Sequence, residues 1–189
     1  MGHSSGWRRC WATLVSVGLL AIGYAQPAQP KEYHIKAIFL FNFVQFVEWP
    51  DIAFSDGSTP ISIGILGDDP FGPSLDEVIR DEKVKGRPLT VVRARRLSDL
   101  SACHLIFVSK SESRRLEDVL SQLSNRPVLT VSELDGFAQR GGVIAFFSEG
   151  KKVRFEINPS SAKRVQLKIS SELLGLGKIT GPNSAGGLD

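Results

Sequence analysis

Two neighbouring carboxylates, Asp68 and Asp69, have residue types and a placement that could bind a ligand. They directly follow the apolar run at 61–67, which predicts a buried strand that ends in a turn. Open α/β sheets bind ligands beyond the carboxyl ends of their strands, so this pair would contact a cation or an amine there, beside Phe71. Asp-Asp-Pro is also typical of a plain turn, and the pattern leaves both interpretations open.

A second polar group is expected on the last strand of the chain. Arg154, Glu156 and Asn158 alternate along the sequence, so their side chains would face the same side of a strand. That face is either solvated or part of a polar site shared with a ligand or partner. The candidate ligand-binding residues are therefore Asp68, Asp69, Phe71, Arg154 and Asn158.

The sequence offers no recognisable arrangement for catalysis or for a metal ion. His34 and His104 stand outside any H-x-x-x-H or H-E-x-x-H pattern, and no G-x-S-x-G elbow is present. Cys103 is the single cysteine after residue 25, so an internal disulfide beyond that point is excluded. It heads an apolar run and is expected in the core, the alternative being a reactive or intermolecular thiol. We therefore predict no catalytic residue, no metal, no cofactor and no enzymatic activity.

Length and composition describe one globular domain behind an export signal. The chain has 189 residues, of which 42% are hydrophobic. Arg8 and Arg9, an apolar run at 10–23 and a small-x-small site predict a signal peptide at 1–25, the alternative being a retained anchor. The remaining chain carries 21 basic and 20 acidic residues, because two of the 23 basic residues lie in the signal. This balance gives no reason to expect nucleic acid as a partner. The signal peptide predicts export to the periplasm.

The opening helix is unusually rich in aromatic residues. Its apolar run at 37–47 is about half as long as a membrane span and is interrupted by two polar residues. One face of the helix predicts a core stripe, and Pro50 ends it. Ile38, Phe41 and Trp49 fall on the other side, where they are covered by another element or form the contact surface for a partner.

The rest of the chain alternates strands with helices, which predicts an α/β fold. We expect a single three-layer domain at 26–180, with a mixed, mostly parallel sheet flanked by helices and a C-terminal β-hairpin. A disordered tail is expected at 181–189. The expected strands are 61–67, 87–95, 103–109, 127–132, 143–148 and 152–157, and the expected helices are 74–82, 112–123, 133–140, 158–165 and 170–178.

The order of these segments resembles the YfiR family of bacterial periplasmic proteins from about Tyr33 to Ile179. The resemblance rests on the motifs KAIFLFNFVQFVEWP, ISIGILGDDPFG, CHLIFVS, VLTVSELDGFAQRGGVIAFF, VRFEIN and ISSELLGLG. It implies a repressor of an inner-membrane diguanylate cyclase that controls cyclic di-GMP and biofilm formation. It further implies that an OmpA-like outer-membrane lipoprotein sequesters the repressor. Redox control through an internal disulfide, which the family resemblance also implies, is in doubt here because Cys103 is alone.

Two functions from different classes follow from these observations. The first is a regulator without enzymatic activity that binds a membrane signalling protein through Ile38, Phe41 and Trp49, the types of residue that carry interface energy. The second is a small-molecule-binding module that acts as a sensor near Asp68 and Asp69. A homodimer is a further expectation, because the apolar residues on the outer side of the first helix need cover.

Overall fold

The computed structural model describes residues 31–181. The predicted signal peptide at 1–25 and residues 182–189 of the predicted tail lie outside this part of the chain. Between residues 31 and 181, no helix has the length and apolar character needed to cross a membrane.

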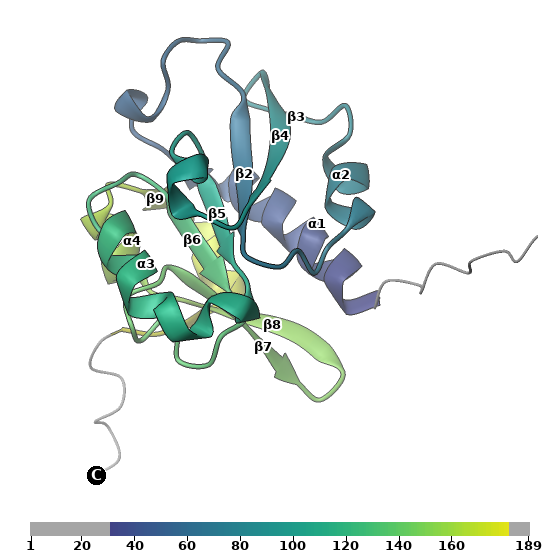
Figure 1. Ribbon diagram of the computed structural model, residues 1–189, viewed down its shortest axis with the longest axis vertical. Helices are drawn as coiled ribbons and strands as arrows, with labels where there is room; N and C mark the ends of the chain where they lie inside the picture. Colours follow the sequence, from purple (N-terminus) through teal and green to yellow (C-terminus); the bar gives the residue numbers. More distant parts are fainter. Residues whose placement is uncertain (1–30, 182–189) are drawn as a thin grey trace, which may run out of the picture.

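One sheet organises the described residues. It has eight strands in the order β10-β8-β7-β6-β5-β2-β4-β3 (Figure 1). The central strands β4, β2, β5, β6 and β7 run parallel, while β8 returns antiparallel to β7 and β3 antiparallel to β4. This confirms the mixed, mostly parallel sheet and the C-terminal hairpin. The strand bounds are β2 Ile61–Leu66, β3 Lys83–Val84, β4 Arg87–Ala94, β5 Leu105–Val108, β6 Leu129–Ser132, β7 Ile144–Glu149, β8 Lys152–Ile157 and β10 Lys178–Ile179.

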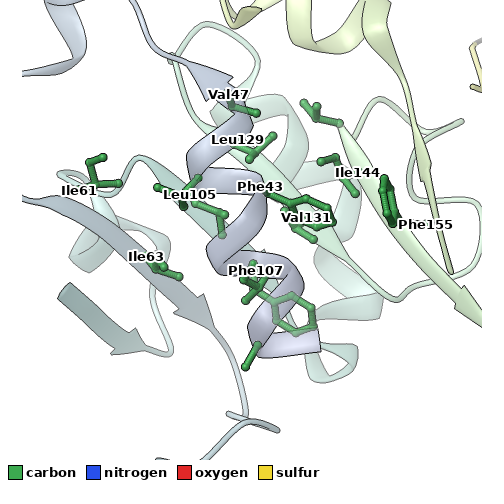
Figure 2. Close-up of a cluster of buried hydrophobic side chains, with 14 of the residues drawn as sticks. Phe43, Val47, Ile61, Ile63, Leu105, Phe107, Leu129, Val131, Ile144 and Phe155 are labelled. Carbon is green, nitrogen blue, oxygen red and sulfur yellow. The ribbon is translucent and has the colours of Figure 1, made fainter. Parts of the chain in front are cut away.

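Helices cover both faces of this sheet, which confirms the three layers. One apolar core joins α1 and α2 to the sheet, and a second core packs α3 and the segment around Phe137 against the other face. In Figure 2, Phe43 and Val47 point from α1 and its continuation towards the apolar side chains of the central strands. The helix bounds are α1 Lys31–Phe46, α2 Pro73–Ile79, α3 Leu116–Leu123, α4 Pro159–Arg164 and α5 Ser171–Leu176, with 3-10 turns η1 Asp51–Ala53, η2 Leu97–Leu100 and η3 Lys110–Arg115.

Two expectations about local structure need correction. The first helix ends at Phe46, before Pro50, because β1 (Val47–Glu48) pairs antiparallel with β9 (Lys168–Ile169). The segment 133–140 forms turns and no helix. Gly136 has a φ of 67°, in the left-handed region that interrupts a helix, and the fully buried Phe137 ring fixes the turn against the sheet.

Candidate functional site

The outer side of α1 carries the first two of the three predicted partner-binding residues. Ile38 is 40% exposed, which is high for a large apolar side chain in a well-packed domain. Phe41 is half-buried and packs against the edge of the core. The other sides of α1 are also apolar, with Leu40 and Phe43 fully buried, so apolar side chains surround the helix on nearly its whole circumference.

Trp49, the third predicted partner residue, lies beyond the end of α1 and is half-buried. Its Nε1 donates a hydrogen bond to the carbonyl oxygen of His104 at 3.0 Å. Together with Phe54 and Arg87 it lines a hollow of about 300 Å³. The Arg87 guanidinium lies 4.0 Å from the centre of the Phe54 ring, which favours a cation–π contact. Partner binding by Ile38, Phe41 and Trp49 stays a prediction.

His104 is buried against Trp49 and Phe54, two residues that line this hollow, and it fastens the loop after α1 to the sheet. Its Nδ1 accepts a hydrogen bond from the Ser62 backbone N–H at 3.1 Å, so its Nε2 carries the proton and donates to the Ala53 carbonyl at 3.0 Å. The imidazole stacks on Phe54 with ring centres 4.6 Å apart. Burial lowers the pKa of His104, with a further contribution from the charge of Arg87, while the Ala53 contact opposes this shift. The neutral ring is therefore a structural element.

The predicted Asp68, Asp69 and Phe71 group forms a turn. Asp69 Oδ1 accepts from the Phe71 backbone N–H at 2.7 Å, and Oδ2 accepts from Arg93 Nε at 2.6 Å. Asp68 is exposed and pairs with Arg95 at 2.9 Å. Phe71 is fully buried in edge contact with other aromatic rings.

Arg154 and Asn158 lie apart from that turn. Arg154 pairs with Glu149 across the hairpin at 3.1 Å. Asn158 is buried, where its Oδ1 caps α4 by accepting from the Ser161 N–H at 3.0 Å and its Nδ2 donates to a backbone carbonyl. The structure does not gather the five predicted ligand-binding residues around one cavity. Their role in ligand binding stays a prediction.

A buried polar cluster that the sequence reasoning missed lies at the carboxyl edge of the sheet. We call it the Glu133 cluster, and it joins the first turns of α1 to the ends of β5 and β6. Glu133 Oε1 accepts from the Tyr33 hydroxyl at 2.7 Å, while Oε2 accepts from Lys36 Nζ and lies 3.5 Å from Lys110 Nζ. Lys36 also pairs with Glu32, one turn earlier in α1. The Lys36 and Glu133 side chains are only 4% and 6% exposed.

Electrostatics hold this cluster in one charge state. Burial alone raises the pKa of Glu133, but the hydrogen bonds from Lys36 and Tyr33 outweigh it and leave that pKa below its usual value. Burial and the hydrogen bond to Glu133 raise the pKa of Tyr33 well above its ordinary value. A carboxylate, an ammonium and a neutral phenol therefore form a satisfied network around neutral pH.

The Glu133 cluster borders a hollow of about 610 Å³. The residues that line its remaining walls are Ser113, Leu134, Asp135, Phe146, Phe147 and Ser148. The volume lies within the range of small-molecule sites, and most of the lining side chains are polar or charged. The sequence contains one signal for this site, which is the charged Lys36 directly before the apolar helical run at 37–47.

Residues 31–181 contain neither an exposed thiol nor a cluster of metal-binding side chains. Cys103 is buried beneath η2, and burial raises the pKa of its thiol to about 11, which keeps it protonated. No group of three or more His, Cys, Asp or Glu side chains in this range could hold a metal ion.

Comparison with known proteins places these features in a family. Residues 33–178 match the YfiR/HmsC-like family (DUF4154). No curated protein matches the sequence significantly. The fold is similar to the crystal structure of a conserved domain protein from Vibrio cholerae O1 biovar eltor str. N16961, with 12% identity and a TM-score of 0.51. That likeness covers 78% of this chain and 60% of the other. Because only 12% of the residues are identical, it bears on the fold alone. The chain, matched over most of its length, belongs to the YfiR/HmsC-like family.

Proposed function

We propose that this protein is a periplasmic regulator that binds an inner-membrane signalling protein, a diguanylate cyclase, and represses it. Repression would lower cyclic di-GMP and thereby limit biofilm formation. The observation that carries the proposal is the family match over residues 33–178. The proposed role needs a docking surface and no reacting groups, which agrees with the buried, protonated thiol of Cys103 and the neutral, packed ring of His104.

The docking surface that we assign to the membrane partner comprises Ile38, Phe41 and Trp49. Ile38 and Phe41 offer apolar area on the outer side of α1, and Trp49 adds an aromatic edge at its end. A regulator changes its target by binding one conformation more tightly than the other. Apolar and aromatic anchors of this kind supply most of the binding energy at such interfaces.

Two further features complete the proposal. The signal peptide at 1–25 would export the chain to the periplasm, where the outer part of an inner-membrane cyclase is accessible. An OmpA-like outer-membrane lipoprotein would compete for the regulator and release the cyclase.

Affinity capture from detergent-solubilised envelope tests the membrane partner. Tagged chain 26–189 is compared with an Ile38→Asp, Phe41→Ala variant and with a Leu176→Asp control, which alters an apolar residue that is 70% exposed elsewhere. We expect the wild type and the control to capture one inner-membrane diguanylate cyclase that the double variant loses, while circular dichroism stays unchanged. Capture that is equal for all three chains would refute the docking surface, and reproducible capture of no cyclase would refute the partner.

A second function, a small-molecule sensor, is favoured by the hollow beside the Glu133 cluster. The hollow lies where β5 and β6 end, and open α/β sheets bind ligands at that edge. In a thermal-shift screen of periplasmic metabolites, a ligand that binds in this hollow should raise the melting temperature of the wild type. A Phe147→Ala variant, which widens the hollow at a half-exposed position, should lose that shift. An equal shift in both proteins would place the ligand elsewhere.

A further inference from the structure

A cavity of about 270 Å³ lies between α3 and α4, two helices that stand next to each other in Figure 1. We call it the α3–α4 cavity. Its α3 wall belongs to the second core, on the other face of the sheet from α1. The cavity also lies at the amino end of β6, whereas the Glu133 cluster lies at the carboxyl edge of the sheet. None of its residues belongs to the proposed docking surface or to the hollow beside the Glu133 cluster.

The walls of the α3–α4 cavity are aliphatic. Five buried side chains line it, namely Leu120, Leu123, Val128, Val143 and Val165. No residue that lines it, in the described part of the chain, is aromatic. Aromatic ligands are commonly held by contacts with aromatic rings, so these walls favour an aliphatic ligand.

Two exposed arginines also line the cavity, and they differ in their partners. Arg140 Nε donates to Glu117 Oε1 at 2.8 Å, and this hydrogen bond lowers the pKa of Glu117. The pair is therefore neutral as a whole. Arg164 has no carboxylate partner within residues 31–181. The lining thus carries two positive charges and one negative charge, and the net charge of +1 resides on the Arg164 guanidinium, which matches a monoanion.

Ser161 provides a second, independent sign of a ligand. It lines the same cavity one helical turn before Arg164, so both residues lie on one face of α4. Ser161 is 2% exposed, and its Oγ has no hydrogen-bond partner among residues 31–181. Its backbone N–H is already bonded to Asn158, so the hydroxyl alone lacks a partner. A buried hydroxyl without a partner costs free energy, which a bound acceptor would recover.

The turn before β7 brings the arginine head group to the cavity wall. Gly141 has a φ of 107°, and a Cβ built on it would lie 3.9 Å from Arg164 Nη1. The guanidinium therefore lies close to the backbone of this turn, which itself lines the cavity.

We propose that the α3–α4 cavity binds a small aliphatic carboxylate. One carboxylate oxygen would accept from the Arg164 guanidinium and the other from the Ser161 hydroxyl, because arginine donors match the geometry of a carboxylate. The aliphatic tail would lie between the leucine and valine side chains, where its burial contributes to binding. The volume is just below the range of drug-sized sites, so the ligand is small.

Isothermal titration calorimetry of purified chain 26–189 with sodium hexanoate at pH 7 tests the site. We expect saturable binding with a dissociation constant on the order of 0.1 mM, as befits a ligand of few atoms. Hexanamide keeps the tail without the charge, and inorganic phosphate keeps negative charge without the tail. Each should bind at least about tenfold more weakly than hexanoate.

Variants on α4 test the two anchoring groups. Arg164→Gln should weaken hexanoate binding at least about tenfold, whereas Lys163→Gln removes a neighbouring exposed charge outside the cavity and should leave binding unchanged. Ser161→Ala should weaken binding about fivefold. The melting temperature of the free Ser161→Ala protein should not fall, because the lost hydroxyl makes no hydrogen bond. This combination separates a ligand-binding hydroxyl from a structural one.

Several results would overturn the proposal. These are no binding of hexanoate at about 10 mM, equal binding of hexanamide or phosphate, and equal affinity of Arg164→Gln and Lys163→Gln. A Ser161→Ala variant that binds hexanoate like the wild type would overturn the assignment of the hydroxyl. The readout uses no membrane partner, so a failure of the cyclase hypothesis leaves this result unaffected.

Discussion

Replacement of Lys36 by methionine should destabilise the protein strongly. Methionine keeps the length of the side chain but removes the ammonium that faces Glu133, and both side chains of this pair are nearly inaccessible to solvent. Removing one member of a buried ion pair costs about 3–5 kcal/mol, because the other charge stays buried without its partner. Glu133 keeps the Tyr33 hydroxyl and the ammonium of Lys110, so we expect a loss of about 3 kcal/mol, the lower end of that range.

Urea unfolding at pH 7 measures this loss, by linear extrapolation of the free energy of unfolding. The Lys36→Met, Glu133→Leu double variant removes both charges and should lose only about 1–2 kcal/mol, mainly for the Tyr33 hydroxyl left without its acceptor. Arg140→Ala breaks the exposed pair with Glu117 and should cost less than about 1 kcal/mol. A loss for Lys36→Met no larger than that for Arg140→Ala, or a double variant that loses as much as Lys36→Met, would contradict this expectation.

Three further predictions follow from buried groups. The pKa of His104 is lower in the folded than in the unfolded chain, so the free energy of unfolding should fall as pH drops below about 6.5, by at most about 1.4 kcal/mol per pH unit. His104→Gln should flatten this pH dependence in urea titrations, and an unchanged slope would contradict the role of His104. The thiol of Cys103 should react with a disulfide reagent at least about 100-fold more slowly in the folded chain 26–189 than in urea, since it is buried with its pKa raised to about 11. A Cβ at Gly142 would lie 2.1 Å from the Phe137 ring, so Gly142→Ala should lower the free energy of unfolding by about 1–3 kcal/mol. Gly175 has open space around it, so Gly175→Ala should cause no loss. Equal effects of the two variants in urea unfolding would contradict this prediction.

The main elements of the sheet could be predicted because their signals are local. The continuous apolar run at 103–109 contains β5, and the alternating run at 61–67 contains β2. The expected helix at 158–165 contains α4, and Asn158 followed by Pro159 is a typical capped helix start, with the asparagine capping the helix in the structure. These features depend on neighbours in sequence, which is why pattern and capping chemistry were sufficient.

What could not be predicted depends on contacts between distant residues. The pairing of β1 with β9 joins two-residue segments more than 100 positions apart, and it ends α1 earlier than Pro50 alone would. The bond between Lys36 and Glu133 spans 97 positions, so nothing local indicates that either charge is buried. The burial of Phe71 against the ring of Phe107, 36 positions further along the chain, is likewise not indicated by its neighbours in sequence.

The most direct test of the regulatory role is the rate of cyclic di-GMP synthesis by a membrane-embedded cyclase captured with this protein. Purified chain 26–189 would be added in increasing amounts from the periplasmic side of reconstituted proteoliposomes. We expect the rate of cyclic di-GMP synthesis to fall in a saturable manner, and the Ile38→Asp, Phe41→Ala variant to shift the curve to concentrations at least about tenfold higher. A synthesis rate that stays constant while binding saturates would contradict the claim that this protein represses its partner.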